Sequence, residues 1–94
     1  MPRAVFGDEV LAESNDTKLV EGNHYFPAES VREELFADSP TQTLCVWKGT
    51  ASYKSLVTDD GVVQDIGWVY ERPTPAASEI AGHVAFGPRV RIEV

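Results

Sequence analysis

The nine residues from Cys45 to Tyr53, CVWKGTASY, hold the side chains best suited to chemistry. They contain the only cysteine of the chain, one lysine, Lys48, and two aromatic rings. A thiol close to an ammonium could act as a nucleophile, because a nearby positive charge stabilises the thiolate. A lysine on an aromatic floor could instead hold a small, partly apolar anion.

The backbone between Cys45 and Lys48 decides whether the thiol and the ammonium can meet. Side chains alternate along a strand, so an unbroken strand would point these two residues to opposite sides of the sheet. A lysine-activated cysteine then fails, unless Gly49 forms a bulge that redirects one of them. Because free cysteines are mostly buried, we expect Cys45 to be a small core residue. Lys48 is either a solvated side chain or the charged rim of a pocket.

The composition predicts one small globular domain covering residues 1–94. Hydrophobic side chains make up 43% of the chain and charged ones 24%, which suits a single core. The net charge of −7 at pH 7 would repel phosphates and anionic membranes, so we expect no nucleic acid or membrane as a partner. A single cysteine excludes an internal disulfide and fits a reducing compartment. With no apolar run of signal-peptide length at the N-terminus, the chain is expected to be cytoplasmic.

Turn-forming residues interrupt the chain every few positions, which is typical of short antiparallel strands. Gly7-Asp8 suits a type II′ hairpin turn, since glycine occupies the first of the two turn positions. Strands are expected at 4–6, 10–12, 17–21, 24–26, 84–86 and 89–94, and from 43 onward, with turns at 22–23 and 38–40.

Asp60-Gly61, between two β-rich runs, predicts a hairpin in the centre of the chain. With these two residues as the loop, Tyr53 faces Trp68 and Ala51 faces Tyr70. Aromatic cross-strand pairs contribute roughly 0.2–1 kcal/mol beyond an Ala–Ala pair, which favours this register. One face of the sheet would then carry Cys45, Trp47, Tyr53, Trp68 and Tyr70.

One short helix is expected near residues 75–81. Thr74 suits its N-cap, Pro75 its first turn and Gly82 its left-handed end. Residues 28–37 have mixed periodicity and are expected to form one short helical turn that runs into extended chain.

No motif predicts a metal or a cofactor, and we expect none. His24 and His83 lie far apart, and neither has a ligand-like spacing. The chain contains no G-x-S-x-G elbow, P-loop or dinucleotide fingerprint. Aromatic rings that a small core cannot bury would line a groove or a dimer interface.

Four segments in order and spacing resemble the small bacterial and fungal family known as domain of unknown function 427. They are HYFP at 24–27, C-x-W-K-G-T-A-S-Y at 45–53, W-x-Y at 68–70 and I-A-G-x-V-A-F at 80–86. The resemblance covers essentially the whole chain and implies a small, mostly antiparallel β domain of tent-like form. The expected fold is therefore a single all-β domain, either tent-like or a sandwich or partly open barrel, with one short helix.

The resemblance implies no established reaction. Proteins of this family are sometimes called nucleotidyltransferases, but that chemistry needs carboxylates that hold two metal ions over a triphosphate. The chain has neither an Asp-x-Asp nor a Gly-Ser nucleotide motif where they would be needed. Val46 also stands where the family usually has proline, and Gly87 where an aromatic residue is common. The family motif falls on Tyr25, Phe26, Pro27, Cys45, Trp47, Lys48, Gly49, Ala51, Tyr53, Trp68, Tyr70 and Phe86.

Three functions follow from these residues. The first is a binding module for a small, partly apolar anion, with no catalytic role required. The second is a structural or protein-interaction domain, as a homodimer or with another partner. The third is an enzyme that uses Cys45 as nucleophile or redox centre. The ligand site expected for the first is formed by Trp47, Lys48, Tyr53, Trp68, Tyr70, Cys45 and Tyr25.

Overall fold

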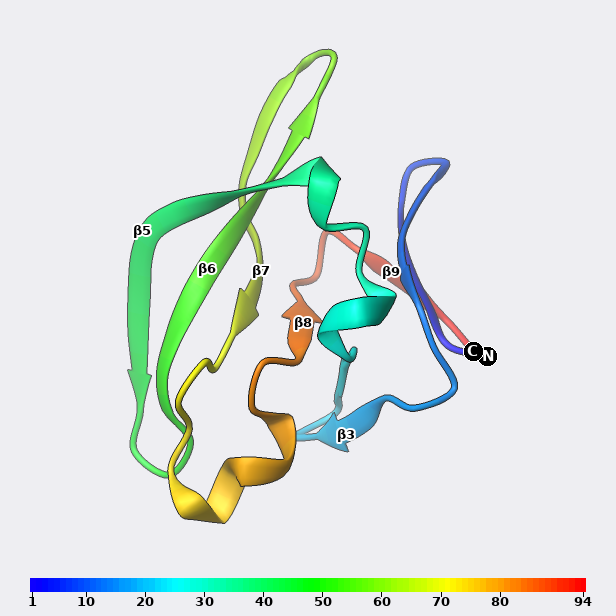
Figure 1. Ribbon diagram of the computed structural model, residues 1–94. Coiled ribbons are helices and arrows are strands. Elements are labelled where there is room, and N and C mark those ends of the chain that lie inside the picture. The colour runs from blue at the N-terminus through cyan, green and yellow to red at the C-terminus, as the bar shows by residue number, and fades with distance from the viewer.

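The computed structural model describes all 94 residues and shows nine antiparallel strands in three sheets (Figure 1). The all-β, antiparallel fold expected from the sequence is confirmed, and no sheet closes into a barrel. The largest sheet, in spatial order, consists of β5 (Phe36–Cys45), β6 (Gly49–Thr58), β7 (Gly61–Val69) and β8 (Val84–Phe86). A second sheet consists of β2 (Glu9–Glu13), β1 (Arg3–Phe6) and β9 (Arg91–Glu93), and β3 (Lys18–Val20) pairs with β4 (Asn23–Tyr25).

Helical structure is limited to three short 3₁₀ segments, η1 (Ala28–Ser30), η2 (Glu33–Leu35) and η3 (Pro75–Ile80). The short helix near 75–81 is thus confirmed as η3, and Gly82 after it has the expected positive φ of 71°. Thr74 does not cap it, because its hydroxyl donates to the Trp47 carbonyl instead. None of these segments has the length and apolar character needed to cross a membrane.

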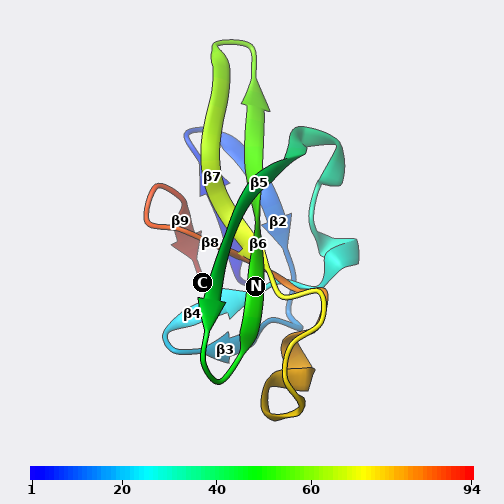
Figure 2. The ribbon, with the colours of Figure 1, turned by 90° about the vertical axis from the view of Figure 1, so that its left-hand side faces the viewer.

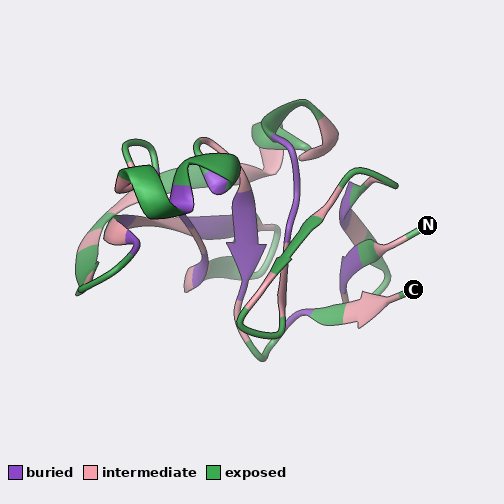
Figure 3. Ribbon diagram, turned by 90° about the horizontal axis from the view of Figure 1, so that it is seen from below, coloured by how far each residue is buried: buried purple, intermediate pink, exposed green.

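Both faces of the β5–β8 sheet are covered by buried side chains, which form two separate cores. The larger core includes Phe26, Leu56, Val69 and Phe86 and packs toward the β1–β2 hairpin. The smaller one, named the tyrosine core, consists of Tyr25, Ala51, Tyr70, Ala77, Ile80 and Ala85. Figure 3 shows β8, which lies between the two cores, as a buried strand.

Alternation along β4 and β8 distributes side chains between the two cores. Tyr25 enters the tyrosine core and its neighbour Phe26 enters the larger core, and both are fully buried. In the same way Ala85 faces the first, whereas Val84 and Phe86 face the second. The HYFP and VAF segments therefore serve the packing around β8, the strand that is buried on both sides.

The β6–β7 hairpin has the predicted Tyr53–Trp68 pair but a different turn. Its loop is Asp59-Asp60, closed by Thr58 opposite Gly61, so the expected loop at 60–61 is wrong. The Thr58 hydroxyl fixes this turn by donating to the Gly61 carbonyl and accepting from the Asp60 amide. The hairpin projects beyond the rest of the molecule (Figures 1 and 2).

A bulge in β7 restores the predicted pairing of β6 with β7 at Lys54 and Tyr53. Gln64 to Ile66 lie opposite the single residue Ser55, and Asp65 has a φ of 55°. The two extra residues of β7 offset the change in register that results from a loop at 59–60 instead of 60–61. The Ser55 hydroxyl accepts a hydrogen bond of 3.1 Å from the Asp65 amide and so holds the bulge.

The predicted turns at 38–40 and 22–23 are also corrected. β5 continues through Asp38-Ser39-Pro40 as an irregular strand, with Ser39 to Thr41 opposite Tyr53. Pro40 is tolerated because β5 is an edge strand. The β3–β4 turn is Glu21-Gly22, whose φ angles of 52° and 81° are those of a type I′ turn.

β7 and β8 approach each other closely at Gly67, and a substitution there tests this packing. A Cβ at this position would lie 2.8 Å from the Ala85 carbonyl oxygen and 3.1 Å from the Phe86 ring. We expect Gly67→Ala to lower the free energy of unfolding by about 1–3 kcal/mol through overpacking, as measured by urea denaturation. Gly87→Ala is the matched control, since its nearest contact would be 3.5 Å. Equal effects of the two substitutions would contradict this packing.

Candidate functional site

The segment from Val46 to Lys48 is a turn between β5 and β6. Cys45 pairs with Gly49 across it, so the expectation of an unbroken strand through these residues is wrong. Gly49 has a φ of 109°, a conformation that side chains disfavour, and this allows the chain to reverse. Val46 is 96% exposed in the turn.

Lys48 is buried at this turn, although lysine is almost never buried without a partner. Its ammonium donates to Oε1 of Glu21 and lies 5.6 Å from the centre of the Trp47 ring and 5.4 Å from that of Tyr70. The Trp47 indole N–H donates to the other oxygen of the same carboxylate at 3.2 Å. We name Glu21, Trp47, Lys48 and Tyr70 the Lys48 corner.

Charge in the Lys48 corner changes the ionisation of its groups. Hydrogen bonds from Lys48 and then from Trp47 lower the pKa of Glu21, outweighing the small opposing effect of burial. Burial disfavours the charged form of Lys48, but the bond to Glu21 and the neighbouring phenols outweigh it and raise the pKa. Burial also disfavours the charged form of Tyr70, and for a phenol this raises the pKa. The nearby Lys48 ammonium acts in the opposite direction. Lys48 and Glu21 are therefore both charged at neutral pH.

The corner is held from both sides by backbone geometry. Glu21 is the first central residue of the type I′ turn, and its positive φ is uncommon for a residue with a side chain. On the other side, the Thr74 amide donates to the Lys48 carbonyl at 3.0 Å and its hydroxyl donates to the carbonyl of Trp47. Two hairpin ends and the segment before η3 thus meet at one ion pair.

Cys45 lies half-buried at the end of β5 and packs against the tyrosine core. Cys45 packs against the core that contains Tyr70, and the Lys48 ammonium lies over the Tyr70 ring, so the prediction that they point to opposite sides is wrong. The reason is the turn, which interrupts the alternation on which that prediction depended. Lys48 nevertheless donates its hydrogen bond to Glu21 and not to the thiol.

The other predicted site residues pack around the tyrosine core. The Tyr53 and Trp68 rings are tilted by 43° with centres 6.1 Å apart, and those of Tyr25 and Tyr70 by 42° with centres 6.4 Å apart. The Trp68 indole donates to the Tyr25 hydroxyl at 3.2 Å. The structure thus gathers the predicted residues but fills the space between them with their own side chains. Among them only Trp47, at 42%, is classed as exposed.

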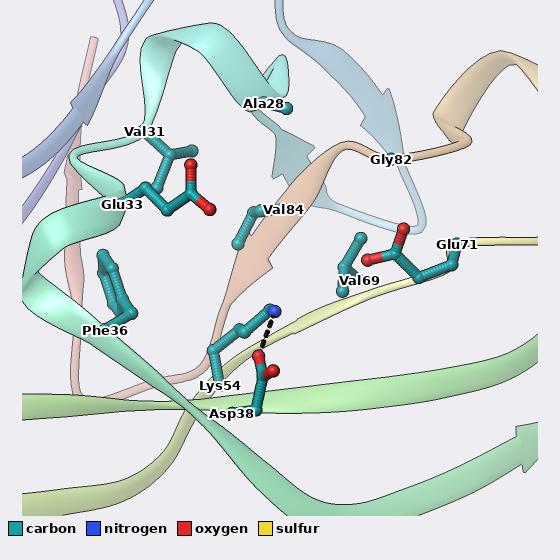
Figure 4. Close-up of a pocket in the computed structure, with 10 residues that line it drawn as sticks. All are labelled: Ala28, Val31, Glu33, Phe36, Asp38, Lys54, Val69, Glu71, Gly82 and Val84. Atoms are coloured by element: carbon teal, nitrogen blue, oxygen red, sulfur yellow. Dashed lines mark hydrogen bonds and ion pairs between the residues drawn. The ribbon is translucent and has the colours of Figure 1, made fainter.

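A hollow of the surface lies beside Lys54, which follows Tyr53 in β6 and so points to the other face (Figure 4). This hollow, named the Lys54 groove, has a volume of about 430 Å³. Connection 28–35 covers one side of it, and its apolar surface comes from Val31, Phe36, Val69 and Val84. The remaining lining residues are Ala28, Glu33, Asp38, Lys54, Glu71 and Gly82.

Acidic groups dominate the charge of the Lys54 groove. Lys54 donates to Asp38 at 2.5 Å, and this bond, together with the charge, lowers the pKa of Asp38. Figure 4 shows the carboxylates of Glu33 and Glu71 on opposite sides of the hollow, and neither has an ion-pair partner. Three carboxylates against one ammonium leave a net charge of −2 on the lining.

The groove was not predicted from the sequence. None of the predicted site residues lines it. Tyr53 lines a smaller hollow of about 270 Å³, which shares Asp38, Lys54 and Glu71 with the groove. The one available indication was the alternation in β6, which places Lys54 opposite the ring-bearing face. In neither place do three or more histidine, cysteine or acidic side chains lie so that they could hold one metal ion together.

The Glu21–Lys48 ion pair predicts a pH-dependent contribution to stability. The pKa of Glu21 is lower in the folded state than the ordinary value of 4.5 for a glutamate, so its charged form stabilises the fold. This contribution is complete above pH 4.5 and is lost as the pH falls through the lowered value. Urea denaturation should therefore show that Glu21→Gln destabilises at pH 7 and that the difference from wild type shrinks below pH 4.

Glu29→Gln is the control, because Glu29 is an exposed glutamate outside every ion pair. We expect its effect to stay within about 0.5 kcal/mol at each pH. A Glu21→Gln difference that is constant from pH 7 to pH 3 would contradict a charge-based contribution.

Comparison with known proteins agrees with the four motif segments. No curated protein matches the chain. The family model described as "Domain of unknown function (DUF427)" matches residues 2–94. The chain therefore belongs to the DUF427 family.

Proposed function

We propose that this domain is a binding module for a small, partly apolar molecule and that the Lys54 groove is its site. The observation that carries the proposal is an apolar surface ringed by a few charged groups in one hollow. Ligand sites in proteins typically have this composition and volumes of about 300–1,000 Å³. At about 430 Å³, the groove falls within that range.

The charges of the groove favour a ligand with a positively charged group. Lys54 already neutralises Asp38, whereas Glu33 and Glu71 have no cationic partner. An ammonium between these two carboxylates would reduce the net charge of the lining from −2 to −1, and the apolar body of the ligand would cover Val69 and Val84. We infer a small, partly apolar amine.

Two other functions have support from particular residues. An anionic ligand at the Lys48 corner, the function expected from the sequence, is supported by the carboxylate that Lys48 and Trp47 already hold. A protein-interaction role is supported by the exposed apolar residues Leu44, Val46 and Trp47 around the β5–β6 turn. Chemistry at Cys45 has less support, since the thiol packs against the tyrosine core.

Three probes of similar size test the groove by thermal shift: 2-phenylethylamine, 2-phenylethanol and 3-phenylpropanoate. We expect stabilisation by the amine alone. A fragment with a Kd of about 1 mM, present at tenfold excess, would stabilise by about 1.4 kcal/mol. For a domain of this size that is a rise in Tm of roughly 6–11 °C.

Variants test whether the amine that raises the Tm binds in the Lys54 groove. Glu33→Gln/Glu71→Gln should abolish the amine-induced shift, and Lys54→Met should enlarge it, because it frees the Asp38 carboxylate. Glu29→Gln/Glu79→Gln makes the same change in net charge at exposed positions that do not line the groove and should leave the shift intact. Equal stabilisation by all three probes, or a shift that survives Glu33→Gln/Glu71→Gln, would contradict the proposal.

A further inference from the structure

The Lys48 corner contains a complete receptor for a carboxylate. Two donors from consecutive residues, the Lys48 ammonium and the Trp47 indole N–H, bind the two oxygens of a single carboxylate. Such charge-assisted bonds are stronger than bonds between neutral groups. The ammonium rests on the Tyr70 and Trp47 rings, and its side chain is only 8% exposed. Burial leaves it dependent on an anion at this place.

The carboxylate that occupies the receptor belongs to a residue that can leave it. The Glu21 side chain is 50% exposed, so water can solvate its carboxylate once it is released. Its backbone is held at a φ of 52° in a hairpin whose strands, β3 and β4, have only three residues each. Rotation of the Glu21 side chain is enough to release the carboxylate, while the fully buried Tyr25 and Phe26 keep β4 in place.

Apolar surface adjoins the receptor on its solvent side. Trp47 is 42% exposed, and Val46, beside it in the same turn, is 96% exposed. A carboxylate carried on an apolar body could therefore place its charge on Lys48 and its body against these side chains. Glu21 offers the charge but cannot cover this surface, because its own stem lies in the β3–β4 turn.

We propose that the Lys48 corner is a second binding site, specific for a carboxylate on an apolar body, and that Glu21 is its built-in competitor. This site is independent of the Lys54 groove, which lies on the other face of β6. Its ligand is either a small free acid or the C-terminal carboxylate of a peptide chain. In the wild-type protein the site is open only when Glu21 has moved away.

The competition sets the size of the expected effect. If the open state is populated at about 10% or less, the apparent Kd of the wild type is about tenfold or more above that of a protein without the competitor. Glu21→Gly provides that protein, because glycine adopts the positive φ of this turn without strain.

The experiment follows the indole N–H resonances of both tryptophans by ¹H–¹⁵N NMR. The probes are 4-methylpentanoate, its amide, and a tetrapeptide ending in leucine with a free or amidated C-terminus. We expect the free carboxylates, and not the amides, to shift the Trp47 resonance saturably in Glu21→Gly, with a Kd at least about tenfold below that of wild type. The Trp68 indole, bonded to Tyr25, is the internal reference for intact folding.

Three variants make the test specific. Lys48→Met in the Glu21→Gly background should abolish the saturable shift, and Asp60→Gly, which removes a carboxylate from the opposite end of β6, should behave as wild type. If Lys48→Met does not fold, Trp47→Phe removes only the indole donor, and weaker binding is then read from the Val46 methyl resonances. Binding of the free acid identifies a small molecule as the source, and binding of the peptide alone identifies a chain terminus.

Equal shifts with acids and amides would overturn the proposal, as would equal Kd values for wild type and Glu21→Gly. Neither result would affect the groove, whose test uses amines and the Glu33 and Glu71 variants. Failure of the amine screen would likewise leave this site untouched.

Discussion

A pair of backbone hydrogen bonds between Phe26 and Val84, each 2.8 Å long, connects the β3–β4 hairpin to the large sheet. The contact fixes β4 against β8 at a point where the side chains of both strands alternate between the two cores. Tyr25 can enter the tyrosine core only if Phe26 enters the other, since a shift of one residue would exchange them. The same contact determines where the Glu21 turn ends and therefore whether its carboxylate reaches Lys48.

The shape of the large sheet depends on two irregularities placed on either side of β6. β5 has extra residues opposite Tyr53, and β7 has extra residues opposite Ser55. Bulges bend a sheet and increase its twist. β6 thus remains the regular central strand, with the tyrosine core on one face and the Lys54 groove on the other. One candidate site lies at the turn before β6, where Lys48 and Glu21 balance each other in charge. The other lies beside Lys54 within β6, where the lining carries a net charge of −2.

Patterns within one hairpin were predictable from the sequence. Tyr53 opposite Trp68 was predicted because aromatic pairing favours one register, and the structure has it. The all-β class and the helix after Thr74 followed from turn residues and capping residues that act locally. The prediction failed at Gly49, because a glycine within a β-prone run is compatible with a strand, a bulge or a turn. The pairing of β5 with β6 selects the turn among these three, and this pairing involves residues well before Gly49 in the sequence.

Both candidate sites depend on contacts that no local pattern encodes. Glu21 and Lys48 are 27 residues apart, and the groove needs connection 28–35 to fold over Lys54. The sequence identified Lys48 and its aromatic neighbours correctly as a group, because they lie close together in the chain or in one register. It did not show that the Glu21 carboxylate would pair with the Lys48 ammonium, nor that the aromatic side chains would fill the space between the predicted site residues.

The pairing of β1 with β9 has a consequence for the order in which the protein acquires its structure. Arg3 lies opposite Glu93, and an ion pair of 2.9 Å joins their side chains. Closing a loop of this length costs about 4 kcal/mol of chain entropy beyond a constant, far more than forming a hairpin. During synthesis the β1–β2 hairpin therefore remains without its third strand until residues 91–93 have left the ribosome. The larger core, which needs Val90, is completed last.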